Sequence, residues 1–260
     1  MRIGRHASSV ARLVAVAATV VIEPQVATAY RPFVSTDAAV AGPGAVEVEF
    51  GYAGFRQDGG RTAIIAPTII GNVGVARDLE VVGEFKLVNE PSRERDDPTR
   101  FEDSAISLKW VARDGVLQEQ GSAPSLAVEL GALLPTVRGK DRPGGELVGI
   151  ASGRTLGCTY HVNGGTLVEP GGDEPGAIWG VILEHAVRGA LRAVVEINGE
   201  TARGNAADNS ALVGAVWAVA APAPLHELSL DIGVRHGISH AADEWGATAG
   251  FTFALPWWTP

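Results

Sequence analysis

Apolar and polar residues alternate one by one along most of the chain after residue 45. In the segment 46–50, Val46, Val48 and Phe50 alternate with Glu47 and Glu49. Successive side chains of a β-strand point to opposite faces, so this alternation predicts strands with one apolar and one polar face. The same pattern recurs at 79–88, 106–111, 126–132, 228–235 and 245–253.

Twelve such segments can be placed along the sequence. They centre near residues 50, 67, 83, 107, 129, 150, 162, 181, 195, 216, 231 and 250. The pattern is weakest in the second segment, where Ile64-Ile65 and Ile69-Ile70 blur it, and in the sixth and seventh, which Gly and Ser dilute. Segments of about ten residues suit tilted strands that cross a membrane, and an even number can close without free edges. The pattern therefore predicts an all-β fold: a closed up-and-down antiparallel transmembrane β-barrel of about 12 strands.

The connections between these segments alternate in length. Long polar connections follow odd-numbered segments at 89–100, 135–146, 167–176, 202–209 and 237–244, whereas short ones follow even-numbered segments at 75–77, 188–189 and 222–224. Bacterial outer-membrane barrels have short periplasmic turns and longer extracellular loops, so the first strand is expected to run outward. The connection at 113–124 is an exception. A soluble periplasmic sandwich or lipocalin-like barrel would also alternate and stays an alternative.

The N-terminus carries the features of an export signal. Basic residues precede the ten-residue apolar stretch 13–22, and Ala27-Thr28-Ala29 fits a cleavage site. Ten apolar residues are too few to span a bilayer as a helix. The expected division is a signal peptide at 1–29, a periplasmic segment at 30–44, an outer-membrane barrel at 45–255 and a C-terminal tail at 256–260. The expected location is the outer membrane of a Gram-negative bacterium.

Net charge and composition restrict the classes of molecule that the protein is expected to bind. The net charge is −9, without a basic cluster, which argues against nucleic acid as a partner. The single cysteine, Cys158, excludes an intrachain disulfide. The expected partners are outer-membrane lipid and a small-molecule solute.

The polar faces of the predicted strands would line the lumen. Nine acids lie on them: Glu47, Glu49, Glu80, Glu84, Glu129, Glu184, Glu196, Glu200 and Asp231. Four bases accompany them: Lys86, Lys109, Arg192 and Arg235. This excess of acids favours passage of cations or neutral solutes. We hypothesise that the bases interleave with the acids and leave a constricted pore. Alternatively, the charges pair across the lumen and plug it, which would leave a structural or surface-binding barrel.

Enzymatic and metal-binding patterns are weak. In Gly149–Gly153 the serine, Ser152, stands fourth, so the segment is not a G-x-S-x-G nucleophile motif. No spacing ties Ser152 to His161 or His185, so we expect no enzyme; an outer-membrane lipid hydrolase is the least favoured alternative. No cofactor is expected. Four further candidate ligands lie at a strand end and loop, where solvated side chains rather than a metal site are expected: His236, His240, Asp243 and Glu244.

The segment 31–52 resembles the start of an outer-membrane family named for the meta-pathway of phenol degradation. The residues that carry this resemblance are Arg31-Pro32-Phe33, Asp37 and Pro43-Gly44, and the segments 102–113, 131–136 and 245–255 are also similar. The resemblance implies an outer-membrane barrel and passive uptake of small aromatic or hydrophobic compounds. One departure is the residues 256–260 that follow Phe253, since such barrels usually end on an aromatic residue.

Overall fold

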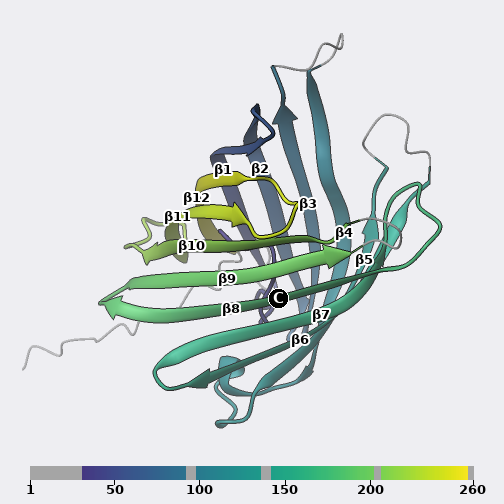
Figure 1. The fold of residues 1–260 in the computed structure, drawn as a ribbon. Helices are drawn as coiled ribbons and strands as arrows, with labels where there is room; N and C mark the ends of the chain where they lie inside the picture. The colour runs from purple at the N-terminus through teal and green to yellow at the C-terminus, as the bar shows by residue number, and fades with distance from the viewer. Residues whose placement is uncertain (1–30, 92–97, 136–141, 202–205, 257–260) are drawn as a thin grey trace, which may run out of the picture.

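Twelve antiparallel strands close into one barrel in the computed structural model, which describes residues 31–91, 98–135, 142–201 and 206–256 (Figure 1). Each strand pairs with its chain neighbours, and β1 pairs with β12 to close the sheet. The predicted closed antiparallel barrel is therefore confirmed. The strands are β1 (Ala45–Asp58), β2 (Arg61–Ala76), β3 (Leu79–Asn89), β4 (Thr99–Arg113), β5 (Ser125–Leu133), β6 (Gly144–Thr155), β7 (Cys158–Val168), β8 (Gly176–Arg188), β9 (Leu191–Thr201), β10 (Asp208–Ala218), β11 (Glu227–Gly237) and β12 (Trp245–Pro256).

The three weakest predicted strands are all present as β2, β6 and β7. In β2 a β-bulge explains the blurred pattern, because the pairing with β3 is interrupted between Ile65 and Thr68. Before the bulge the odd-numbered Ala63 is buried, and after it the even-numbered Thr68 and Asn72 are buried. A bulge adds one residue to one strand and so shifts which positions face inward.

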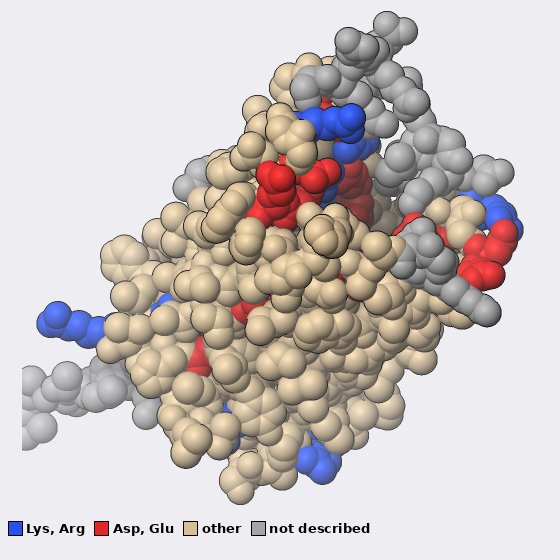
Figure 2. Space-filling view, viewed as in Figure 1, with Lys and Arg blue, Asp and Glu red and all other residues tan. Residues whose placement is uncertain are grey.

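The barrel is apolar outside, and its interior holds many polar side chains together with smaller apolar clusters. On β4, Ile106, Leu108 and Trp110 are 54%, 43% and 49% exposed, whereas Ser107 and Lys109 between them are 5% and 0% exposed. Figure 2 shows few charged side chains across the middle of the visible face, and a cluster of acids and bases at the mouth above it. A soluble lipocalin-like barrel has the opposite arrangement, with apolar side chains filling its interior.

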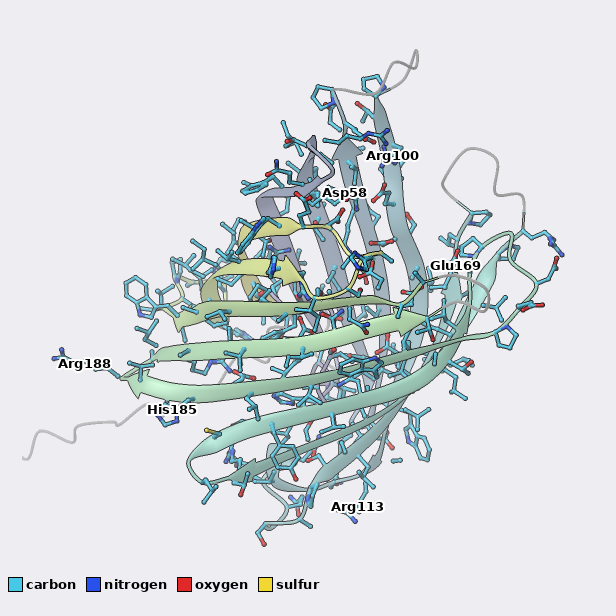
Figure 3. The ribbon with its side chains drawn as sticks, in the orientation of Figure 1. Asp58, Arg100, Arg113, Glu169, His185 and Arg188 are labelled. Atoms are coloured by element: carbon cyan, nitrogen blue, oxygen red, sulfur yellow. The ribbon has the colours of Figure 1, made fainter. Side chains whose placement is uncertain are left out.

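The two ends of the barrel differ. We call the end where β1 begins and β12 ends proximal, and the other end distal. Figure 3 places Asp58, Arg100 and Glu169 at the distal end. The longer connections 90–98, 134–143, 169–175 and 238–244 belong to that end, and the two-residue turns 77–78, 156–157 and 189–190 are proximal.

Two connections, 59–60 and 219–226, depart from the predicted alternation of lengths, and the exception expected at 113–124 is present as 114–124. The distal connection Gly59–Gly60 has only two residues, both with positive φ. The proximal connections 114–124 and 219–226 are longer, and the first contains the 3-10 turn Val116–Gln118. Among the described residues, no helix is long and apolar enough to span a membrane. The predicted signal peptide 1–29 and the tail residues 257–260 lie outside the described residues.

Candidate functional site: the barrel lumen and its inner ring

Residues 31–42, which precede β1, run inside the barrel; we call this segment the inner ring. Its first residue is held at the seam of β11, β12 and β1. The Arg31 Nε atom lies 3.4 Å from Asp231 Oδ2, and Arg31 Nη2 donates a hydrogen bond to Thr248. The guanidinium lies against Gly51 and Gly250, which are opposite each other in the sheet. A β-carbon at either glycine would overlap it, so the wall has a notch for Arg31.

The ring continues past β10, β9 and β8, and on β8 the Ser35 side chain lies against Gly180. Phe33 packs against the buried Val194, Leu212 and Val216. The backbone amides of Val34 and Ser35 donate to the carboxylate of Glu196, with distances to Oε1 of 3.1 and 2.7 Å. A carboxylate that accepts two amide hydrogens forms charge-assisted bonds, which are stronger than neutral ones.

The next residues lie against β7, β6 and β5. The Thr36 amide donates to Asn163 Oδ1 at 3.0 Å, and Asn163 Nδ2 returns a bond to the Thr36 carbonyl at 2.7 Å. The Ala38 amide donates to Ser152 Oγ at 2.9 Å, and the Ala38 methyl group lies in an apolar cluster with Ala127. From the proximal connection, Gln118 Nε2 donates to the Ala38 carbonyl at 2.8 Å.

The ring ends against β4, β3 and β2. Lys109 Nζ lies 3.6 Å from Asp37 Oδ1 and 3.4 Å from Glu80 Oε1. Burial raises the pKa of the Asp37 carboxyl, because desolvation disfavours its charged form. The Ala41 amide donates to Glu80 Oε2 at 2.7 Å, and the backbone of Gly42 lies against Gly74. With these contacts the inner ring touches every strand of the barrel in turn.

A chain of hydrogen bonds supports the ring from the wall. Ser152 Oγ lies 2.8 Å from His161 Nδ1, His161 Nε2 lies 3.0 Å from Glu184 Oε1, and Arg192 Nη1 donates to Glu184 Oε2 at 2.6 Å. The expectation that nothing ties Ser152 to His161 is therefore wrong. They are opposite each other in the β6–β7 hairpin, whose tight turn fixes the register. His185 lies apart, beside Cys158 at the proximal end.

The hydrogen-bonded series Ser152–His161–Glu184 has the residue types of a catalytic triad, but its serine is not accessible to a substrate. Ser152 is 0% exposed, and the Ala38 amide already donates to its hydroxyl. A nucleophile must reach its substrate, whereas this serine is covered by the ring. The observed contacts assign the chain a positioning role, in which it holds Ala38 against the wall.

The predicted lumen residues fall into three sets. Six line a cavity on the distal side of the ring: Glu84, Lys86, Lys109, Glu129, Glu200 and Arg235. Five of the others bind the ring or support it: Glu49, Glu80, Glu184, Glu196 and Asp231. The remaining two are Arg192, which pairs with Glu184, and Glu47, which is 7% exposed.

Each of the four predicted bases has an acidic partner. Lys86 Nζ lies 2.7 Å from Asp103 and 3.8 Å from Glu84, and Arg235 Nη2 lies 2.5 Å from Glu196. Lys109 and Arg192 pair as described above. Each base thus lies beside an acid, whereas the hypothesis that these residues leave a constricted pore stays a prediction.

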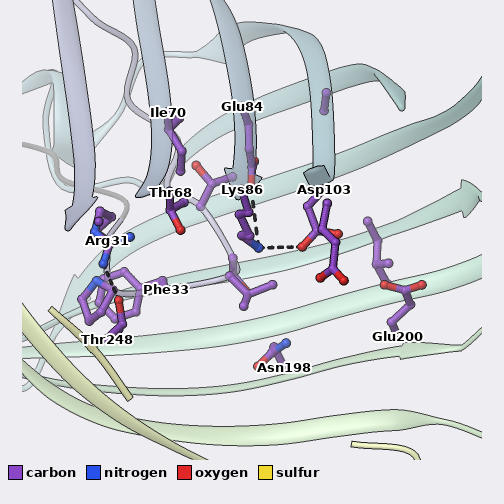
Figure 4. A pocket seen from close by; sticks show the side chains of 18 of the residues that line it. Arg31, Phe33, Thr68, Ile70, Glu84, Lys86, Asp103, Asn198, Glu200 and Thr248 are labelled. Carbon is purple, nitrogen blue, oxygen red and sulfur yellow. Dashed lines mark hydrogen bonds and ion pairs between the residues drawn. The ribbon is translucent and has the colours of Figure 1, made fainter. Parts of the chain in front are cut away.

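The cavity has a volume of about 860 Å³ and reaches from the distal mouth to residues Arg31–Thr36 of the inner ring (Figure 4). Nine acids and five bases are among its lining residues. Figure 4 shows Glu84, Lys86 and Asp103 across the cavity from Asn198.

Sequence reasoning missed several cavity residues for two reasons. Arg56 turns inward because a bulge between Gly51 and Ala53 shifts the alternation in β1, and it bridges the mouth to Glu102 at 2.9 Å. Glu146 was assigned to a connection, but β6 begins at Gly144 and so includes it. The distal end of β6 is therefore longer than expected, and it adds Glu146 to the acids that line the cavity.

The chain matches no family model, and no curated protein matches it. The resemblance to the phenol-degradation family therefore has no support from these comparisons. Among solved structures, OmpF of Salmonella typhi in complex with daunomycin is 7% identical, with 81% of this chain and 97% of that chain covered and a TM-score of 0.38. OmpT of Vibrio cholerae is 10% identical, with 81% and 96% covered and a TM-score of 0.33. The barrel assignment rests on the strand pairing of this chain.

Proposed function

We propose that this barrel spans the outer membrane of a Gram-negative bacterium, with lipid against its outer face. The exposed Val, Leu, Ile and Trp side chains support this, because an apolar surface of this extent is unfavourable in water. The labelled charged side chains lie at the two ends of the barrel (Figure 3), as they would at the two membrane surfaces. The strands have 9 to 16 residues, enough to cross the hydrocarbon when tilted.

Within that membrane, we propose a passive channel for small neutral or cationic molecules. The observation that carries this proposal is the cavity, which is entered at the distal mouth and has more acids than bases on its walls. Solutes would collect there because acidic walls in a space of low dielectric attract cations and repel anions. Passage would be limited at the inner ring.

The inner ring also favours a second candidate, a plugged barrel. It is held by charged groups and main-chain bonds along its length, and Gln118 supports it from the proximal side. If the ring never yields, the cavity is a closed pocket and the distal loops would carry any function.

Planar bilayer recordings separate the two candidates. We expect the wild-type protein to give small, cation-selective currents, and Arg31→Ala to give larger ones because it removes the anchor at the Gly51–Gly250 notch. Arg77→Ala is a matched control, since Arg77 pairs with Asp114 at the proximal end, where its side chain is 73% exposed. Silence of all three proteins at every voltage would reject the channel and support the plugged barrel.

Membrane placement has its own test. A folded outer-membrane barrel is expected to migrate differently on gels before and after boiling, and to need detergent for extraction. A protein that is soluble without detergent and insensitive to boiling would contradict the proposed location.

A further inference from the structure

The lining of the cavity includes an apolar floor and a group of acids beside and distal to that floor. Its apolar floor consists of Phe33, Ile70, Val82, Val148, Ile178 and Leu212. Two hydrophobic clusters contribute to it: Phe33 packs on the cluster that contains Leu212, and Ile178 packs on the cluster that contains Val148. The floor is thus a continuation of buried apolar packing rather than a set of isolated side chains.

Two of the cavity acids lie on the distal side of this floor, whereas Glu129 and Glu200 are opposite Val148 and Ile178 in the sheet. On β3, Glu84 is two residues distal to Val82, and on β6, Glu146 is two residues distal to Val148. Both pairs line the cavity. Two residues along a strand span about 6.6 Å, so an acidic group stands roughly that far above an apolar one on each side.

Glu146 is the acid whose surroundings most favour a cationic guest. Four other acids line the same cavity: Glu84, Asp103, Glu129 and Glu200. Like charges held together destabilise one another, and a cation placed among them removes that repulsion. The acids alone would leave the ligand undefined, but the adjoining apolar floor and the enclosed volume restrict its shape.

We propose that the cavity is a binding site for amphipathic organic cations, with the charged head group against the acids of β3 and β6 and the apolar body on the floor. The volume of about 860 Å³ lies in the range of small-molecule sites. A head group and a ring separated by two or three carbon atoms match the offset between Glu146 and Val148. This inference rests on the proposed channel and names the class of solute that the channel would retain.

Calorimetric titration of the detergent-solubilised protein tests the site without any need for current. Three probes separate the contributions: 2-phenylethylammonium has both features, tetramethylammonium has only the charge, and 3-phenylpropionate pairs a similar apolar body with a negative charge. We expect 2-phenylethylammonium to bind at least tenfold more tightly than either of the others. Equal affinities, or no binding of any probe, would overturn the proposal.

Two variants locate the bound probe. Glu146→Gln should weaken 2-phenylethylammonium at least fivefold, whereas Glu119→Gln, an exposed acid of the proximal connection, should leave its affinity unchanged. Val148→Thr keeps the side-chain shape and should weaken 2-phenylethylammonium but not tetramethylammonium. If Glu146→Gln and Glu119→Gln behave alike, the head group does not lie against Glu146 and the site is refuted.

The outcomes also separate this inference from the channel itself. A protein that conducts in bilayers but shows no preference among the probes would retain the channel and lose the binding site. A protein that binds 2-phenylethylammonium through Glu146 but never conducts would retain the binding site and lose the channel. The cavity would then be a closed receptor site.

Discussion

The contact between Gly74 and the end of the inner ring allows a sharp test of how the ring is seated. Gly74 lies on β2 and faces inward, and its missing side chain leaves room for the backbone of Ala41 and Gly42. In Gly74→Ala the new methyl group would overlap two main-chain carbonyl groups. Main-chain atoms cannot rotate away as a side-chain tip can, so the ring must shift or the strand must move.

The size of the effect follows from these two ways of relieving the overlap. An extra methyl group forced into a packed interior costs about 1–3 kcal/mol. If the ring lifts away instead, the 2.7 Å bond from the Ala41 amide to Glu80 is lost, and a hydrogen bond to a charged group contributes about 1.5–3 kcal/mol. Either way, Gly74→Ala should lower the free energy of unfolding by about 1–3 kcal/mol.

The matched control is Gly71→Ala on the same strand. A β-carbon at Gly71 would meet nothing within 4 Å, and this position faces outward. Glycine within a strand weakens it, so this substitution should be neutral or slightly stabilising. The assay is guanidinium unfolding of the protein in lipid vesicles, followed by tryptophan fluorescence, with bilayer current as a second measurement. We expect Gly74→Ala to be less stable and to conduct more. If the two variants have equal stability and equal current, the ring is not seated as described.

Four further predictions follow from individual contacts. Ser152→Ala leaves the buried Ala38 amide without its acceptor and should cost about 1–3 kcal/mol of unfolding free energy; no loss in the unfolding assay would contradict this. Lys109→Met leaves Glu80 without its cation and should cost about 3–5 kcal/mol, as breaking a buried ion pair does; a loss below about 1 kcal/mol, typical of an exposed pair, would count against it. Glu129→Gln should reduce the cation-to-anion permeability ratio in bilayers, and an unchanged reversal potential would disprove its part in selectivity. Because the pKa of Asp37 is raised in the folded state, its contribution to stability is complete below pH 3.8 and is lost as the pH rises through the raised value, so unfolding titrations of Asp37→Asn should lack that component of the pH dependence.

The pairing of strands was predictable because it follows from a local pattern. Alternation along each strand and a turn between strands are enough to specify an up-and-down barrel, since each strand pairs with its chain neighbours. The face of each residue was predictable only where no bulge intervened. Arg56 lies beyond the bulge in β1, and the added residue turns it from the face of Val46, Val48 and Phe50 to the lumen. In β1, unlike in β2, the bulge does not blur the alternation of the residues before it.

The inner ring could not be predicted from periodicity, because its contacts are made mostly by main-chain amides. Val34, Ser35 and Ala38 bind through groups that every residue has. The signal that existed lay in the partners: inward-facing glycines at positions such as Gly51 and Gly250, in strands that otherwise carry larger side chains. The residues 30–44 are predicted to form a periplasmic segment before the barrel; strand β1 begins at Ala45, and residues 31–36 before it line the cavity inside the barrel.

Some polar residues of the lumen bind the inner ring, and others line the cavity on its distal side. This division predicts which substitutions affect stability and which affect solute binding. Near the ring, Glu196, Ser152 and Glu80 accept hydrogen bonds from backbone amides of the inner ring. Substitutions there should therefore alter both the stability of the barrel and the blockage of the lumen by the ring. On the distal side, Glu146 and its acidic neighbours face the cavity, so changes there should alter the choice of solute with little effect on folding. A barrel whose lumen were only a polar core would show no such division, because every charge would then contribute to stability. The test is to measure the unfolding free energy and the probe affinity of Glu196→Gln, near the ring, and Glu146→Gln, in the cavity. If Glu196→Gln mainly lowers stability and Glu146→Gln mainly lowers affinity, the lumen binds a solute; if both mainly lower stability, the lumen is a polar core.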